Sequence, residues 1–381
     1  MLKKKILMIT ERRADYSKLR PIIKEIKKSK KLDFQLIVTG SHLLSKYGHT
    51  IDDIKRDNFK ISSILPMFKK NAPDTGAEMV RAFGRILLKL TDEFERLKPD
   101  IILSGFDIGG NFAGSILGAH MNILVAHIEG GEITGTIDES IRHAITKFSH
   151  LHFTSNKIAT DRIVKMGENK KYVFTVGNTS LDGILSVKII PKDKLYKKYG
   201  LNAKKPYIII LQHTVTSEID QIDKNFVKTL NAIKELDIQA IVIFGNSDAG
   251  SKKIGKLIKI LKIKHFLSIP YIDYINLLRN SSALVGNSSS GIIEAPFLKI
   301  PSINIGTRQT GRTSSTSILN VGYDESQIKK AILKSLNDKK FLKTVKNTQS
   351  LYGNGNTAKK IVKILEDINL KKISTQKKLM Y

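Results

Sequence analysis

The chain has 381 residues, 41% hydrophobic and 26% charged, proportions that exclude wholesale disorder and the fibrous classes. It contains no cysteine, which excludes a disulfide framework, a thiolate metal site and a cysteine nucleophile. The 64 basic and 35 acidic residues give a net charge of +29, which favours anionic ligands.

Short β-branched segments alternate with longer segments of helical period, the pattern of parallel sheets wound on both faces. In the first half of the chain, the expected strands are residues 5–10, 33–39, 61–65, 100–104, 122–127, 150–154 and 172–176. The clearest helices between them are residues 17–28, 76–97 and 137–148. After Pro191, the expected strands are residues 207–211, 239–244, 265–268, 283–285 and 302–305, and a last helix is expected over 357–370.

These elements predict an α/β protein with two Rossmann-like, doubly wound domains. The periodicity breaks near residues 187–193, so we assign residues 1–187 to the N-terminal domain and residues 188–370 to the C-terminal, nucleotide-binding domain. The last helix is able to pack back on the first domain. Residues 371–381 form a polar tail that we expect to be frayed.

The positive charge alone does not predict a nucleic-acid-binding protein. The basic residues are mostly Lys spread over several predicted helix faces, as within residues 24–31 and 252–264. No aromatic RNA-binding pattern, zinc-ligand spacing or arginine-rich arm accompanies them. We therefore expect a nucleotide-like anion as the ligand, rather than DNA or RNA.

The sequence predicts neither export nor a membrane partner. A basic start resembles that of a signal peptide, but the apolar stretch 6–9 is cut short by Glu11, Arg12 and Arg13. No window approaches the roughly 18 apolar residues that a membrane-spanning helix needs. We expect a cytoplasmic protein.

Three carboxylates occupy positions suited to proton transfer. Ligands of parallel α/β sheets bind beyond the carboxyl ends of the strands. Asp107 and Glu129 follow two expected strands in glycine-flanked loops, and Asp138 opens the helix 137–148. Each alone is also typical of a turn or of a helix start. Because all three should meet at one sheet edge, the sequence favours acid/base chemistry.

Among the nine histidines, His213 has the best position, because it directly follows the expected strand 207–211 and precedes a helix. His42 and His143 are secondary candidates, since a lone histidine is more often a structural residue. No metal-ligand spacing such as H-E-x-x-H occurs, so we expect no metal site.

A diphosphate site is expected after the strand 283–285. There a glycine and a run of serines lead into a helix, which directs free backbone N–H groups and the positive helix end at one anion. The serines of this run are Ser288, Ser289 and Ser290. Glu294, one turn into the helix, is placed to accept hydrogen bonds from a ribose diol.

Further nucleotide contacts are expected from two other strand ends. Arg308 follows the strand 302–305 and supplies a guanidinium group suited to phosphate oxygens. Asn246 closes another strand and is expected to face the nucleotide. Residues 353–358 match G-x-G-x-x-A, but they follow a helix rather than a strand, so we interpret them as a turn that opens the last helix.

Together these motifs resemble the hydrolysing UDP-N-acetylglucosamine 2-epimerases of the sialic- and legionaminic-acid pathways. The resemblance covers most of the chain and is carried by residues 13–19, 127–131, 135–147, 288–296 and 306–309. It implies two Rossmann-like domains in a GT-B arrangement with the site in the inter-domain cleft. We also expect a homo-oligomer, either a dimer or a tetramer.

The resemblance further implies a reaction and roles for the site residues. UDP-N-acetylglucosamine would be converted to N-acetylmannosamine and UDP, through anti elimination to a 2-acetamidoglucal and its hydration, without a cofactor, for sialic-type acid biosynthesis. The residues that match the catalytic positions are Asp107, Glu129, Asp138 and His213. Those that match the diphosphate and ribose positions are Arg13, Ser288, Ser289, Ser290, Glu294 and Arg308.

Some alternatives stay open at this point. Glu11-Arg12 differs from the dipeptide that many relatives carry before the arginine, so the substrate could instead be GDP-N-acetylglucosamine or a modified UDP-sugar of the legionaminic type. The sequence does not tell which carboxylate is the acid and which the base. A GT-B glycosyltransferase is a further alternative, against which the three carboxylates argue.

Overall fold

The computed structural model describes residues 2–69, 72–107, 109–244, 250–260 and 264–380, which form two compact α/β units. Unit 1 comprises Met1–Glu132, Ile137–Leu185 and Tyr352–Tyr381, and unit 2 comprises Ile133–Thr136 and Ser186–Leu351. The chain thus passes between the units after Leu185, and residues from 352 onward belong to unit 1.

Unit 1 is built on a seven-stranded parallel sheet of order β3-β2-β1-β4-β5-β6-β7. Its strands are β1 (Lys4–Thr10), β2 (Leu32–Thr39), β3 (Ser63–Leu65), β4 (Ile101–Gly105), β5 (Leu124–Ile128), β6 (Leu151–Thr154) and β7 (Val173–Thr175). Its helices are α1 (Arg13–Ile26), α2 (Ile51–Arg56), α3 (Gly76–Leu97), α4 (Gly109–His120), α5 (Ile137–Phe148), α6 (Lys157–Lys165), α7 (Thr179–Leu185) and α15 (Thr357–Asp367).

Helices cover both faces of this sheet, as the side chains of β1 show. Ile6 and Met8 pack in one apolar cluster with residues of α1 and α15, while Leu7 and Ile9 pack in another with residues of α3 and α4. Successive residues of a strand point to opposite faces, so a strand buried on both faces reads as a continuous apolar run. This confirms the doubly wound fold expected from the sequence.

Unit 2 repeats the scheme with a six-stranded parallel sheet of order β10-β9-β8-β11-β12-β13. Its strands are β8 (Tyr207–Leu211), β9 (Gln239–Ile243), β10 (His265–Phe266), β11 (Ala283–Gly286), β12 (Ser302–Ile305) and β13 (Ile318–Val321). Its helices are α8 (Lys192–Tyr199), α9 (Ile222–Lys234), α10 (Ser251–Ile260), α11 (Tyr271–Asn280), α12 (Ser290–Phe297), α13 (Glu325–Asn337) and α14 (Lys339–Asn347). β13 was not expected from the sequence.

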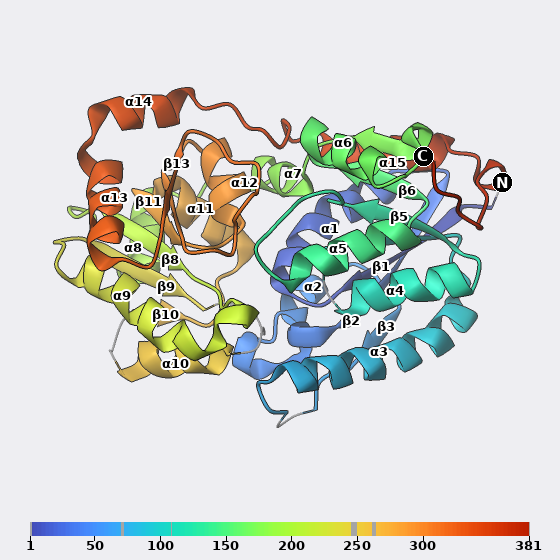
Figure 1. Cartoon of the computed structure of the whole chain (residues 1–381), viewed down its shortest axis with the longest axis horizontal. Coiled ribbons are helices and arrows are strands. Elements are labelled where there is room, and N and C mark those ends of the chain that lie inside the picture. The colour runs from blue at the N-terminus through green and yellow to red at the C-terminus, as the bar shows by residue number, and fades with distance from the viewer. Residues whose placement is uncertain (1, 70–71, 108, 245–249, 261–263, 381) are drawn as a thin grey trace. The chain divides into compact units, whose positions relative to one another are not determined.

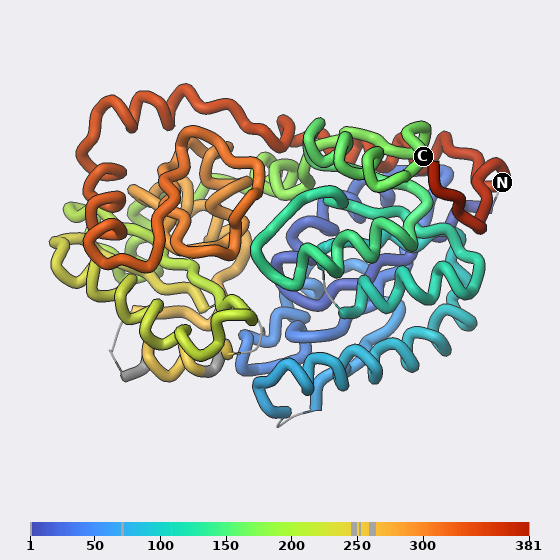
Figure 2. Tube along the Cα trace, in the orientation of Figure 1, coloured from blue at the N-terminus to red at the C-terminus, as the bar shows by residue number. Residues whose placement is uncertain are grey.

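The C-terminal segment differs from the frayed tail that the sequence suggested. Helix α15 contacts α1 and α7 of unit 1 and is drawn in red among its blue and green elements (Figure 1). Beyond it, Ile373 is buried in the core of unit 1, and Lys377 Nζ donates to the carbonyl oxygens of Thr146 and Lys147 at the end of α5. The chain runs back beside its own beginning (Figure 2), where Lys4 Nζ donates to the carbonyl oxygen of Leu365. An apolar anchor and a half-buried cation therefore fasten a segment whose composition is polar.

None of the helices in the described part of the chain combines the length and the apolar character that a membrane span requires.

Candidate active site

In unit 1, the predicted acidic residues lie beside the point where the strand order reverses. β1 and β4 are neighbours there, with β2 and β3 on one side and β5 to β7 on the other. Loops that leave such strands diverge to opposite faces of the sheet and leave room for a ligand. Arg13 begins α1 directly after β1, Asp107 follows β4, and Glu129 follows β5.

Asp107 is held in an unusual backbone conformation beside a buried cation. Phe106 and Asp107 have φ angles of +68° and +55°, which non-glycine residues rarely adopt. Arg142, on α5, donates one guanidinium N–H to the Asp107 carboxylate and another to the carbonyl oxygen of Glu132, at 2.7 Å. Arg142 therefore fixes the direction of the carboxylate.

The three carboxylates interact electrostatically. Burial raises the pKa of Asp107, Arg142 opposes that rise, and the charges of Asp138 and Glu129 add to it. Asp138 lies in the first turn of α5, four residues before Arg142 and so on the same helix face. The carboxyl group of Asp107 thus holds a proton more readily than an ordinary aspartate, as proton transfer near neutral pH requires.

Glu129 has one carboxylate oxygen engaged and one available. Its φ angle is +61°, and Oε2 accepts a hydrogen bond of 2.6 Å from Lys18 Nζ on α1. Lys18 Nζ also lies 5.3 Å from the centre of the Phe106 ring. Oε1 is buried and has no hydrogen-bond partner among the described residues. A buried acceptor without a partner is costly, so Oε1 is placed to accept a hydrogen bond or a proton from a ligand.

The two secondary histidines differ in their surroundings. His42 is buried, and its ring nitrogens lie 2.9 Å from Thr10 Oγ1 and 2.7 Å from Thr50 Oγ1. Burial lowers the pKa of His42 to about 3, so it is a neutral, hydrogen-bonded core residue. His143 lies on α5 with Nε2 3.8 Å from Glu139 Oε1, and partial burial lowers its pKa.

In unit 2, the predicted nucleotide-binding residues also surround a reversal of strand order, between β8 and β11. His213 follows β8, and its backbone N–H donates to Asn287 Oδ1 at 2.7 Å. The Asn287 side chain in turn donates to the carbonyl oxygen of His213 at 2.9 Å. Asn287 directly follows β11 and is fully buried, so it ties together the two loops at the switch point.

The serine run forms a tight turn into α12. Gly286 has a φ angle of +133°, and a Cβ atom there would lie 2.3 Å from the carbonyl oxygen of Leu211. Only glycine permits this close approach. Ser288 Oγ accepts from the backbone N–H of Ser290 at 3.3 Å, whereas Ser289 lies between them, half-buried, before the first residue of α12. The turn therefore leaves short polar side chains at a helix N-terminus.

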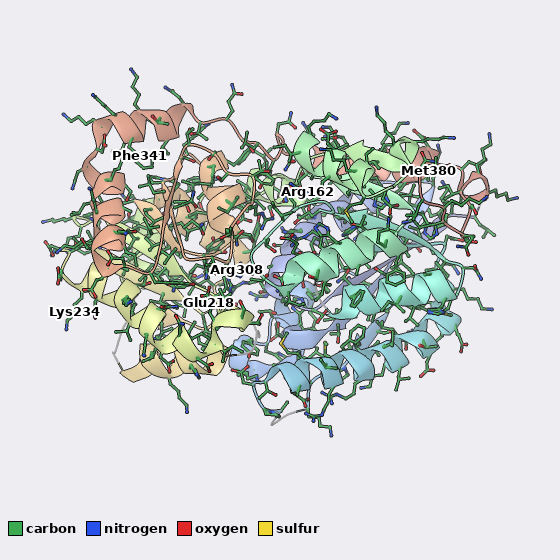
Figure 3. The ribbon with its side chains drawn as sticks, in the orientation of Figure 1. Arg162, Glu218, Lys234, Arg308, Phe341 and Met380 are labelled. Carbon is green, nitrogen blue, oxygen red and sulfur yellow. The ribbon has the colours of Figure 1, made fainter. Side chains whose placement is uncertain are left out.

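Glu294 and Arg308 border this turn. The Ser290 hydroxyl donates to the Glu294 carboxylate and also bonds the Tyr274 hydroxyl. Arg308 Nη1 donates to the carbonyl oxygen of Asn287 at 3.1 Å, so the guanidinium group lies at the start of the serine run. Figure 3 labels Arg308 beside Glu218, whose carboxylate accepts from Thr307. Asn246, the other predicted nucleotide contact, lies outside the described residues.

Four residues that sequence reasoning missed support the predicted ones. They are Lys18, Arg142, Tyr274 and Asn287. The i, i+4 spacing from Asp138 could have identified Arg142, and the position directly after a buried strand could have identified Asn287. Nothing in the spacing of Lys18 or Tyr274 indicates their partners, because these come from distant parts of the chain.

Two doubly wound parallel α/β units with charged and polar loops at their switch points are typical of enzymes that act on nucleotide-linked substrates. Residues 24–366 match the model of the family described as UDP-N-acetylglucosamine 2-epimerase. The chain therefore belongs to this enzyme family, which confirms the resemblance found in the sequence.

Individual relatives support the same membership. The chain is 35% identical to a UDP-N,N'-diacetylbacillosamine 2-epimerase (hydrolyzing) of Legionella pneumophila, over 96% of this chain and 97% of the relative. It is 34% identical to a GDP/UDP-N,N'-diacetylbacillosamine 2-epimerase (hydrolyzing) of Campylobacter jejuni, over 84% of each.

A solved structure shows the same fold. The UDP-GlcNAc 2-epimerase of Neisseria meningitidis, crystallised with UDP-GlcNAc, is similar with a TM-score of 0.80 and 21% identity, over 95% of this chain and 99% of that one. The likeness confirms the predicted fold class of two Rossmann-like domains.

Proposed function

We propose that this protein is a hydrolysing 2-epimerase that converts UDP-N-acetylglucosamine and water to N-acetylmannosamine and UDP. The observation that carries the proposal is the group of three interacting carboxylates in unit 1, of which Asp107 and Glu129 follow strands and Asp138 opens α5. Arg142 holds Asp107, and Lys18 holds Glu129. Family membership supports the substrate class. Three further properties stay predictions from the sequence: a site in the cleft between the two domains, a homo-oligomeric state and a cytoplasmic location.

The first step is an elimination. The C2 proton of the sugar is weakly acidic, because C2 is not next to a carbonyl group, so its removal has to be coupled to loss of the group on C1. A carboxylate takes the C2 proton, the C1–O bond breaks, and its electron pair leaves with the UDP oxygen as the C1–C2 double bond forms. Unit 1 supplies the carboxylate in this proposal.

The second step is a hydration of the 2-acetamidoglucal. The oxygen of a water molecule bonds to C1, and a proton is delivered to C2 on the face opposite to the one from which the first proton left. This inverts C2 and yields N-acetylmannosamine. Two groups on different faces of the sugar are needed, and a cluster of several carboxylates with His213 as a further candidate offers them.

Unit 2 holds the leaving group in this proposal. The negative charge that develops on the diphosphate is stabilised by cations and by N–H groups that are already oriented. Arg308, Ser288 and the start of α12 at Ser290 provide such groups around one turn. Arg13 at the start of α1 and Glu294 are assigned to the diphosphate and the ribose, as the sequence predicted.

The test is a time course with purified protein and UDP-N-acetylglucosamine, without any acceptor. The expected products are free N-acetylmannosamine and UDP in equal amounts. Accumulation of UDP-N-acetylmannosamine would instead indicate epimerisation without hydrolysis. A sugar nucleotide that stays intact until an acceptor alcohol is added would indicate a glycosyltransferase.

A second candidate substrate is UDP-N,N'-diacetylbacillosamine, because two relatives at 35% and 34% identity carry that sugar in their names. The reaction at C1 and C2 would be the same, and only the groups at C4 and C6 differ. Comparing kcat/KM for the two UDP-sugars and for GDP-N-acetylglucosamine decides among them. A preference of at least tenfold for one substrate identifies it.

A further inference from the structure

Two adjacent residues after β1 contact the main chain on both sides of Asp107. Arg12 Nη2 donates to the carbonyl oxygen of Phe106 at 2.8 Å, just before Asp107. The backbone N–H of Gly110, in the first turn of α4, donates to Glu11 Oε2. The two contacts therefore reach the main chain before and after Asp107.

Arg12 is itself fixed before it reaches Phe106. Its Nε donates to Asp15 Oδ1 at 3.0 Å, and the same carboxylate accepts the backbone N–H of Arg12 at 3.0 Å. The Asp15 carboxylate thus accepts from both the main chain and the side chain of Arg12 at the start of α1. The guanidinium group therefore has little freedom left when it binds the Phe106 carbonyl oxygen.

Glu11 occupies a space that glycines leave open. Its side chain is buried, and a Cβ atom on Gly40 would lie 2.8 Å from the Glu11 Cβ, while one on Gly110 would lie 3.0 Å from Glu11 Oε2. The carbonyl oxygen of Glu11 accepts from His42 N at 3.1 Å and from Ser41 Oγ at 3.0 Å. These two bonds fix the main chain of Glu11, from which its carboxylate extends to Gly110.

The turn that they hold needs support. Phe106 and Asp107 both have positive φ angles, a backbone conformation that is unfavourable for residues other than glycine. Arg142 donates to the Asp107 carboxylate, and among the described residues no hydrogen bond joins it to the main chain of the turn. The main-chain contacts come from Arg12, from Glu11 and, at Gly105 N, from Asn111 Oδ1 at 3.1 Å.

We propose that Glu11 and Arg12 are positioning residues that hold the turn carrying Asp107 in the backbone conformation required for proton transfer. The proposal rests on the function assigned to Asp107 above. It gives two residues from another strand end a role that acts through the Asp107 turn.

The first experiment compares the variants Arg12→Met and Glu11→Leu, which remove these contacts, with Glu11→Gln, which retains an acceptor for Gly110 N. Arg20→Met is the matched control, because Arg20 lies on α1 and pairs with Asp57 at 2.6 Å, away from the turn. The first two variants are expected to lower kcat at least tenfold, with KM and the Kd of UDP within twofold of the parent. Glu11→Gln and Arg20→Met should keep kcat within twofold.

A second comparison separates positioning from general destabilisation. In an Asp107→Asn background, Arg12→Met should lower kcat by less than twofold further, because residues that act through one group are not additive. An additional loss of tenfold or more in that background would overturn the proposal. Should Arg12→Met fail to fold, Arg12→Lys replaces it, since a single ammonium group cannot make both bonds.

Hydrogen exchange keeps this test independent of the proposed function. A peptide spanning residues 103–112 should exchange faster in Arg12→Met and Glu11→Leu than in the parent and in Arg20→Met. If the parent lacks the proposed activity, the proposed function fails on its own, and unchanged exchange in all variants would show that the contacts do not hold the turn. Faster exchange with unchanged kcat in an active parent would overturn the positioning role.

Discussion

The two units use the ends of their strands differently, although their sheets follow one scheme. In unit 1, Asp107 after β4 and Glu129 after β5 are acidic residues with positive φ angles, and each carboxylate is paired with a cation. In unit 2, the positive φ angles at the ends of β11 and β12 belong to Gly286, the last residue of β11, and to Gly306, directly after β12, at +133° and +76°. A positive φ angle at a strand end therefore occurs at acidic residues in unit 1 and at glycines in unit 2.

This difference indicates a division of chemistry. Glycine and serine allow backbone N–H groups to approach an anion closely. Acidic residues in costly conformations have their carboxylates fixed in place, which proton transfer needs but anion binding does not. The fold alone thus does not decide the chemistry, and the residues at a few strand ends do.

The largest effect is expected from neutralising the acids of unit 1. Asp107→Asn and Glu129→Gln should each lower kcat by about 10²–10⁴, since each removes a proton-transfer group. The Kd of UDP, measured by calorimetry, should stay within threefold, because the proposed function places most groups that hold the diphosphate in unit 2. Unchanged turnover in both variants would end the assignment of acid/base chemistry to unit 1.

The next effect tests how unit 2 holds its switch point. Asn287→Ala should lower the free energy of unfolding in urea by about 2–4 kcal/mol, because it removes buried bonds to His213 and leaves groups unsatisfied. Asn320→Ala is the control, since Asn320 is exposed and accepts one bond, from Asn304. Asn320→Ala should lower the free energy of unfolding by less than about 1 kcal/mol. Equal losses of unfolding free energy in the two variants would show that the bonds between Asn287 and His213 do not stabilise unit 2 more than a surface contact does.

A pH effect is expected from unit 1. Burial, and next the charge of Asp15, raise the pKa of Glu11 from 4.5 to about 7. The folded state then binds this proton more tightly than the unfolded state, so the stabilisation it gives is complete below about pH 4.5 and is lost as the pH rises to 7. The change is on the order of 3 kcal/mol. The parent should therefore lose stability relative to Glu11→Gln between pH 5 and pH 7.5 in urea titrations, and a constant difference would contradict this.

The smallest effect concerns the cation of unit 2. Arg308→Met should weaken UDP binding by about tenfold, the loss of one charge-assisted contact to a phosphate oxygen. kcat should fall less than in the acid variants of unit 1. Lys234→Met is a control for net charge, because Lys234 is exposed at the end of α9, and it should leave the Kd unchanged. If both variants weakened UDP binding equally, the effect would come from the net positive charge of the protein and not from a binding site at Arg308.

Most strands could be predicted because both faces of each sheet are buried. The strand Tyr207–Leu211 is fully buried and has the predicted bounds. Helix α3 also has the predicted bounds. The strand Ile318–Val321 was missed because it is an edge strand with one exposed and two half-buried residues, so its apolar signal is weak. The docked tail was missed because one buried residue, Ile373, and one half-buried residue, Lys377, do not change its polar composition.

The site divides in the same manner. Position after a strand was enough to select Asp107, Glu129, His213 and the serine run. The partners that fix them, such as Lys18 for Glu129 and Tyr274 for Ser290, come from distant segments and depend on packing that no local pattern encodes. His42 was a secondary candidate from its sequence position, and the structure shows why it is a core residue instead. Both of its ring nitrogens are hydrogen-bonded, to Thr10 and to Thr50.

The most direct measurement is an NMR time course of the parent protein with UDP-N-acetylglucosamine in deuterated water. Removal of the C2 proton by a carboxylate and its replacement from solvent predict released N-acetylmannosamine with one deuterium at C2, formed together with UDP. Released sugar that keeps its original C2 proton, or UDP release without inversion at C2, would contradict the account.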